Sequence, residues 1–204
     1  DWSSDVCSSD LTIDPATRQP IRTMADLTLP ATFLPFLPVA PVALEIPART
    51  APDPVADRLG LDDLFPGGFV DEPAARSCLS GILLLRDDFA RSHEVCQDLD
   101  TAEGGYWHGI LHRREPDPAN ARYWMARVGS HPVHLRLAEE LAGASGAGDA
   151  SPSSDASLLG RDGRWDPVRF IDACNARGMT AGTRRRLEAI QMREADRKST
   201  RLNS

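Results

Sequence analysis

Lysine is almost absent from this chain, since Lys198 is the single one among 204 residues. The chain also has no excess of basic residues: it contains 30 acidic and 23 basic residues, and its net charge is −7. Because nucleic acids and anionic membrane surfaces bind proteins through basic patches, we expect neither as a partner. The most apolar stretch, 27–47, is interrupted repeatedly by proline, and proline breaks helices, so we expect no membrane span.

Both ends of the chain are unlike natural protein sequence. Residues 1–11 read DWSSDVCSSDL, and the DNA that can encode them has a reverse complement that encodes DRKSTRLNS, residues 196–204. Two ends of one natural protein have no reason to be related in this way. We therefore interpret both as translated sequencing-adapter DNA and exclude them, as one excludes a tag. The natural reading frame is then expected to continue past Ala195, which makes the chain a truncated fragment.

Cysteine is scarce and widely spaced. Without Cys7, which lies in the adapter-like segment, the chain has Cys78, Cys96 and Cys174. An odd number of distant cysteines favours reduced thiols over a disulfide framework. We therefore expect a soluble cytoplasmic protein.

Helix start and stop signals dominate the second part of the chain, and no convincing strand alternation occurs. Asp117-Pro118 and Asp166-Pro167 each predict an N-cap followed by the first helical residue, and Gly129 and Gly178 each predict a helix end. We further expect a turn at 103–105, before a helix from Tyr106 to Glu115, and an N-cap at Thr183. The fold class is all-α: a compact domain of about six or seven helices with a Pro-rich, extended N-terminal strap.

The strap is expected to lie along the helices, because its apolar content is too high for a solvated linker. The side chains that it would bury are Phe33, Leu34, Phe36, Leu37 and Val39. A small, polar stretch after the central helices predicts a flexible linker. The expected division is adapter 1–11, Pro-rich leader 12–70, helical core 71–142, linker 143–163, a C-terminal helical pair 164–195 and adapter 196–204.

The densest signal lies between Ser92 and Pro132, which includes the run YWHGILHRREPDPANARYWMARVGSHP. This segment resembles an uncharacterised protein family with the motif YWHxxxHRREPDxxNAxYWxRxVGxHP, preceded by SHxxxQ. The chain departs from the family pattern at Gly109, where alanine is expected, at Met125, where an aromatic residue is expected, and at Ala126, where the motif has arginine. The resemblance implies membership of a family and no activity, cofactor or substrate.

Helical geometry places polar side chains together within this segment. At about 100° per residue, His108, His112 and Glu115 fall on one flank of an apolar stripe that contains Trp107 and Leu111. Two histidines one turn apart can bind a divalent transition metal, and a carboxylate can complete the set. The candidate metal ligands are thus His108, His112 and Glu115, and His93, on the preceding helix, could be a fourth.

The same residues have plainer interpretations. A histidine beside an aromatic stripe can be a packed residue that is hydrogen-bonded to its neighbour. The candidate ligand site is His93, His108, His112, Arg113 and Glu115. Arg113 and Arg114, beside Glu115 and Asp117, could clamp a phosphate or carboxylate ligand, or could form inter-helix ion pairs, which we prefer. His93 and Cys96 are spaced as a nucleophile and its base would be, but a buried structural thiol fits the pattern better.

Two functions of different classes follow. The first, which we prefer from sequence, is a non-catalytic helical hairpin module for packing or for binding another protein. The alternative is a metal-binding or small-ligand-binding enzyme that uses His93, His108, His112 and Glu115, with a divalent transition metal as the candidate cofactor. The two differ in convergence: a site needs side chains from two helices that meet, whereas a packing role leaves each histidine with a separate partner.

Overall fold

The computed structural model describes residues 35–37, 42–45, 53–144 and 155–200. These residues form eight α-helices, a short 3-10 helix and no strand, so the all-α expectation is confirmed. In chain order the helices are α1 (Leu61–Leu64), α2 (Glu72–Leu85), α3 (Phe89–Gln97), α4 (Ala102–Arg114), α5 (Pro118–Val128), α6 (Pro132–Ala144), η3 (Asp155–Leu158), α7 (Pro167–Cys174) and α8 (Ala181–Thr200). None of the described helices is long and apolar enough to cross a membrane.

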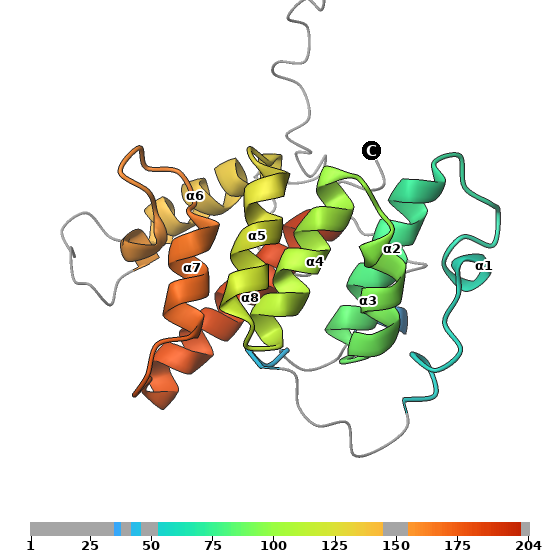
Figure 1. Ribbon diagram of the computed structural model, residues 1–204, viewed down its shortest axis with the longest axis horizontal. Coiled ribbons are helices and arrows are strands. Elements are labelled where there is room, and N and C mark those ends of the chain that lie inside the picture. The colour runs from blue at the N-terminus through green and yellow to red at the C-terminus, as the bar shows by residue number, and fades with distance from the viewer. Residues whose placement is uncertain (1–34, 38–41, 46–52, 145–154, 201–204) are drawn as a thin grey trace, which may run out of the picture.

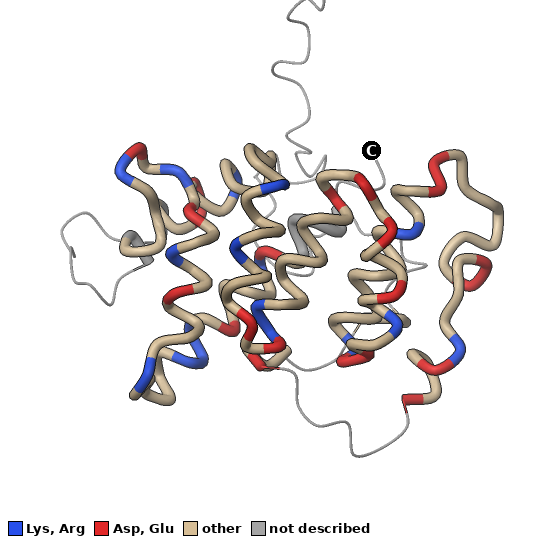
Figure 2. Tube along the Cα trace, in the orientation of Figure 1, with Lys and Arg blue, Asp and Glu red and all other residues tan. Residues whose placement is uncertain are grey.

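Five helices stand side by side and one lies behind them. Figure 1 shows α2, α3, α4, α5 and α7 as a row of upright helices, and successive members of the row pack on one another. Helix α8 crosses behind the row and contacts α2, α6 and α7. Acidic residues predominate around α1 to α3, whereas basic residues gather in the loops on either side of α7 and at the start of α8 (Figure 2). The arrangement makes α4 a central helix, with neighbours on several sides.

Aspartate caps start two of the helices as the sequence predicts. The Asp117 carboxylate accepts the backbone N–H of Asn120 at 3.1 Å, with Pro118 as the first residue of α5. The Asp166 carboxylate accepts the N–H of Val168 at 2.9 Å, with Pro167 opening α7. Gly129 ends α5 with a φ of 64°, a conformation that glycine adopts without strain.

Three local expectations are wrong. Helix α4 begins at Ala102 rather than after a turn at 103–105, because Thr101 caps it by accepting the Gly104 N–H at 3.0 Å. Helix α7 ends at Cys174, several residues before Gly178. The N-cap role expected of Thr183 belongs to Thr180, whose hydroxyl accepts the Thr183 N–H at 3.1 Å.

Glycine in α4 permits close packing rather than a turn. A Cβ on Gly104 would lie 2.4 Å from the Cβ of Leu99, and a Cβ on Gly109 would lie 2.9 Å from Cε of Met125. Gly109 and Met125 are therefore in direct contact. The Met125 side chain lies in the space that a methyl group on residue 109 would need.

Part of the Pro-rich leader packs on the helices. Val42 and Leu44 are buried, and the carbonyl oxygen between them, on Ala43, accepts hydrogen bonds from Arg114 and from Gln191 at 3.1 and 3.0 Å. Of the residues expected to be buried by the strap, two pack half-buried against the core, and the others, Phe33, Leu34 and Val39, lie outside the described residues.

The expected linker, 143–163, falls partly outside the described residues, which resume at Asp155. From there the chain packs on the core, because Leu158 in η3 is buried and Leu159 forms a single antiparallel bridge with Trp165. The last turns of α8 reach into the segment predicted to be adapter-encoded. That assignment stays a prediction.

Gly81 makes one of the two tightest glycine contacts in the core and gives a first prediction. A Cβ at this position would lie 2.4 Å from Cζ2 of Trp107, a fully buried ring that cannot move aside. We expect Gly81→Ala to lower the free energy of unfolding by about 1–3 kcal/mol, the usual cost of overpacking. Urea denaturation followed by circular dichroism measures the change. The matched control is Gly67→Ala, where a Cβ meets nothing within 4 Å; equal losses in both variants would contradict the prediction.

Candidate metal centre

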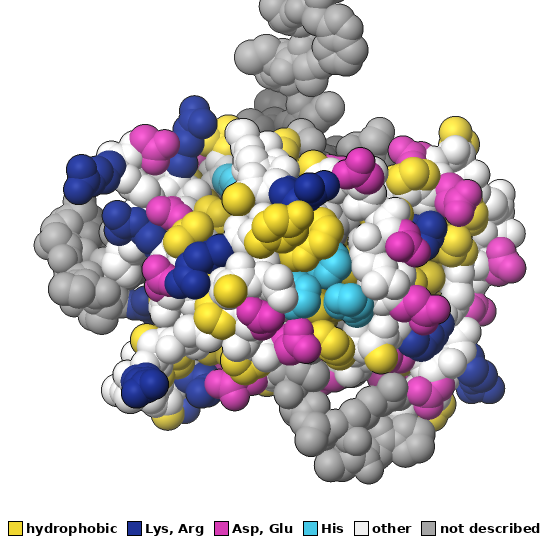
Figure 3. Space-filling model, in the orientation of Figure 1, with side chains coloured by type: hydrophobic (Ala, Val, Ile, Leu, Met, Phe, Trp, Pro, Cys, Tyr) yellow, Lys and Arg dark blue, Asp and Glu magenta, His cyan; other side chains and the backbone are white. Residues whose placement is uncertain are grey.

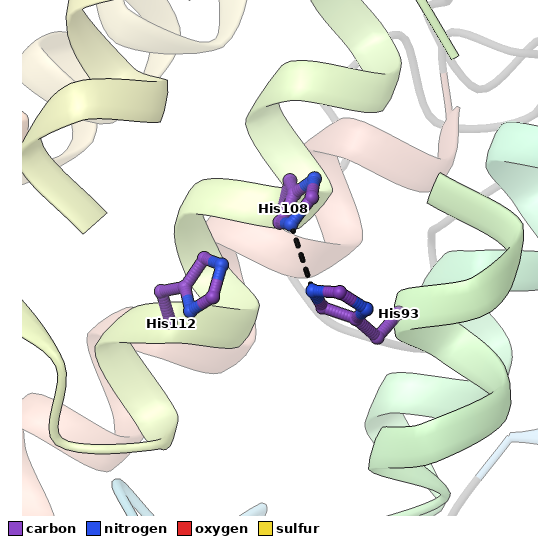
Figure 4. Close-up of side chains that lie close together, drawn as sticks. All are labelled: His93, His108 and His112. Atoms are coloured by element: carbon purple, nitrogen blue, oxygen red, sulfur yellow. Dashed lines mark hydrogen bonds between the residues drawn. The ribbon is translucent and has the colours of Figure 1, made fainter. Parts of the chain in front are cut away.

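Three histidines from two helices meet at the surface of the helical row. His93 lies on α3, and His108 and His112 lie one turn apart on α4. One ring nitrogen of each lies within 4.8 Å of those of the other two, and Nε2 of His93 is 3.2 Å from Nε2 of His108. Figure 4 shows the three rings turned toward a common point between the helices. The convergence that separates a site from simple packing is therefore present.

The position of His93 depends on a hydrogen-bonded contact between α2 and α3. The Ser80 hydroxyl lies 3.1 Å from the carbonyl oxygen of Ser92, and the Ser92 hydroxyl donates to the carbonyl oxygen of Ser80 at 2.9 Å. Both serines are fully buried. Because Ser92 immediately precedes His93, this reciprocal pair fixes the backbone from which His93 reaches toward α4.

His108 is the most enclosed of the three histidines. Its ring is 3% exposed and stacks on Trp124 of α5, with ring centroids 4.0 Å apart and planes 14° from parallel. Burial, reinforced by the neighbouring His112 and His93, lowers the pKa of His108 to about 4. The ring is thus neutral at physiological pH, so one of its nitrogens carries a lone pair.

His112 is oriented by a carboxylate. Its Nδ1 lies 2.9 Å from Oε2 of Glu115, one turn further along the chain. The other ring nitrogen, Nε2, is on the side of His93 and His108 (Figure 4). Metal-binding histidines commonly have this arrangement, in which a carboxylate on the second nitrogen fixes the ring and strengthens it as a ligand.

The structure brings only part of the expected ligand set of His108, His112 and Glu115 together. The structure groups His108 and His112 with His93, whereas Glu115 groups with His112 and Asp117. His108 and Glu115 share one flank of the helix but are separated by seven residues, or about 10 Å along the axis. Glu115 therefore supports His112, and His93 is the third residue that faces the common point. The Asp117 carboxylate is already engaged in capping α5.

The two arginines that follow His112 face away from the histidines. Nη2 of Arg113 is 2.6 Å from Oε2 of Glu194 on α8, and Arg114 pairs with Asp87 at the end of α2. Both arginines are buried. Arg113 is therefore not part of the histidine site. Its pair with Glu194 is the inter-helix ion pair that we preferred from the sequence. Glu194 was missed, because no local pattern connects it to α4.

Cys96 does not form a nucleophile pair with His93. Its sulfur lies 3.6 Å from the backbone carbonyl oxygen of His93 and is fully buried. Burial raises the pKa of the Cys96 thiol to about 11, which keeps it protonated and unreactive. The structural interpretation of this cysteine therefore fits its surroundings.

The histidine cluster is open to solvent on one side. Figure 3 shows histidine side chains at the centre of the face, bordered by an apolar patch above and by acidic residues below. His93 is half-buried, whereas His108 and His112 are buried. His93 is therefore the member of the cluster that is most exposed to solvent.

Comparisons with protein-family models, with curated proteins and with solved structures find no match to this chain. The case for a function therefore rests on the geometry of the site.

Proposed function

We propose that the protein binds a divalent transition metal through His93, His108 and His112. The observation that carries the proposal is the convergence of three imidazole rings from two helices, with ring nitrogens within 4.8 Å of one another. We prefer this function to the helical packing module, because a packing role does not require three histidines to share one point.

The cytoplasmic location expected from the cysteines is part of the proposal; no disulfide joins Cys78, Cys96 and Cys174.

The separation of two ring nitrogens fits a tetrahedral ion. Zinc–nitrogen bonds of about 2.0–2.1 Å at tetrahedral angles place two ligand nitrogens about 3.3 Å apart. Nε2 of His93 and Nε2 of His108 are 3.2 Å apart. A neutral N–H···N hydrogen bond has a similar length, so metal titration is the measurement that separates the two.

The donor set indicates the class of metal. Imidazole nitrogens suit zinc, copper, nickel and iron, whereas magnesium and calcium prefer oxygen ligands. Three protein ligands leave one tetrahedral position for water or a substrate, which is typical of catalytic rather than structural zinc sites. Enzymatic activity at that open position is the extension of the proposal. The depressed pKa of His108 favours binding at neutral pH, since no proton must leave that ring.

The test is titration of tag-free, metal-free protein with Zn²⁺ by calorimetry and with Co²⁺ by visible absorption. We expect one ion per chain and the intense absorption bands of tetrahedral cobalt. His93→Ala and His112→Ala should each weaken binding about 100-fold or more, because each removes one of three ligands. Glu115→Gln should weaken binding about 10-fold to 100-fold, as the loss of an outer-shell partner does.

The matched control is His134→Ala, because His134 is a half-buried histidine on α6 that contacts Tyr106 rather than the cluster. This variant should bind zinc as the unaltered chain does. Circular dichroism confirms that each variant is folded. If His93→Ala and His134→Ala bind with equal affinity, or if neither metal binds, the three-histidine proposal is wrong.

A further inference from the structure

A second concave site lies on another face of α4. It is a pocket of about 240 Å³ at which the leader, the end of α4, the end of α7 and the start of α8 come together. The polar residues in its lining are Glu45, Arg113, Asn175, Arg177 and Arg184, with Cys174 among the others. None of these residues belongs to the histidine cluster.

Arg113 contributes a buried guanidinium to this lining, and part of it has no partner. Its Nη2 donates to Glu194 and Gln191 at 2.6 and 3.3 Å, and its central carbon lies 4.4 Å from the centre of the Phe170 ring. Its Nε and Nη1 are buried without a hydrogen-bond acceptor among the described residues. Buried donors are nearly always satisfied in native proteins, so these two are the donors that an acceptor group bound in the pocket would satisfy.

The charges around the pocket favour an anion. Arg113, Arg177 and Arg184 line it, and Glu45 is the one acid in the lining. Glu45 and Arg184 form an exposed pair at 3.4 Å, and exposed pairs of this kind are weak and readily exchanged. Arg177 is exposed and forms no ion pair with a described residue. The charge of Arg113 is balanced by Glu194, so Arg177 and Arg184 supply the attraction for an incoming anion, and Arg113 supplies its two unpartnered N–H groups.

We propose that this pocket binds a small oxyanion, a molecule that carries a carboxylate or phosphate group. Arg177 and Arg184 attract the anion at the mouth, and the unpartnered N–H groups of Arg113 donate to it at the base. Both kinds of group offer the oxygen acceptors that guanidinium groups bind. The proposal does not depend on metal binding at the histidines.

The test uses the full chain, freed of metal ions and labelled with ¹⁵N, in nuclear magnetic resonance titrations. Inorganic phosphate and acetate are added separately at constant ionic strength, with chloride as the balancing anion. We expect at least one of them to produce saturable shifts in the backbone amides of Asn175 and Arg177 and in the Nε–H signal of Arg113. The anion that binds more tightly identifies the chemical group that the pocket prefers.

Variants at the mouth of the pocket keep the test independent of the buried arginine. Arg177→Gln and Arg184→Gln should each weaken binding about tenfold, since each removes one charged partner. Arg185→Gln is the matched control, because Arg185 is an exposed neighbour of Arg184 that does not line the pocket; it should change the affinity less than about twofold. Shifts that do not saturate with either anion, an Arg113 signal that does not move, or equal weakening by Arg185→Gln would overturn the proposal.

Discussion

Glu194→Gln is expected to lower the free energy of unfolding by about 3–5 kcal/mol, because it leaves the Arg113 guanidinium charged, buried and uncompensated. The side chains of both residues are 0% exposed, and their closest atoms are 2.6 Å apart. Oε1 of Glu194 also accepts a hydrogen bond from the Tyr106 hydroxyl at 2.9 Å. Burial lowers the pKa of Arg113, but Glu194 more than offsets that effect, so the net shift is upward. Urea denaturation at pH 7, followed by circular dichroism, measures the loss.

Two further variants separate the buried charge from general damage. In the double variant Arg113→Met, Glu194→Leu, no charge is left unpaired, so more than half of the lost stability should return. The exposed pair of Arg127 and Asp100, with nitrogen and oxygen 3.3 Å apart, is the matched surface control. Asp100→Asn should have no measurable effect, because water screens this pair. If Glu194→Gln is as mild as Asp100→Asn, the buried pair contributes nothing specific.

The features that could be predicted from the sequence are those that depend on residues close together in the chain. Asp-Pro pairs set the starts of α5 and α7 through hydrogen bonds that span two or three residues, and those predictions are confirmed. The spacing of His108 and His112 depends on one turn of helix and is equally local. The predicted N-terminus of α4 was wrong because Gly104 and Gly105 resemble a turn signal. In the structure both lie inside the helix, and the small size of Gly104 permits it to lie against Leu99.

Features that depend on the packing of distant segments could not be predicted. His93 could be named as a further ligand, but its distance from His108 depends on how α3 packs against α4. Glu115 was assigned to the ligand set from angular position alone, without regard to the rise between turns. Glu194 is separated from Arg113 by 81 residues, and its charge suggested solvent exposure rather than a place behind the helical row.

Between pH 7 and pH 4.5 the protein is expected to lose about 2–3 kcal/mol of stability through His108 alone. The folded protein has a His108 pKa of about 4, below the ordinary value of 6.5. The unfolded chain therefore binds the proton first as the pH falls, and this shifts the equilibrium toward unfolding. The contribution is fully present above pH 6.5 and is lost progressively toward pH 4. Asp53 and Asp117, whose pKa values are lowered from 3.8, titrate below this window.

The measurement is the free energy of unfolding of metal-free protein, from urea denaturation at half-unit steps of pH. His108→Phe is the informative variant, because a phenyl ring can keep the stack on Trp124 but cannot take up a proton. The free energy of unfolding of His108→Phe should change less steeply with pH than that of the unaltered chain. The difference between the two proteins from pH 7 to pH 4.5 should be about 2–3 kcal/mol, the loss expected from His108. Added Zn²⁺ should steepen the slope of the unaltered chain, since protons compete with the metal for the three rings, and should leave His108→Phe unchanged. Parallel pH profiles for the two proteins would show that His108 is not the group responsible.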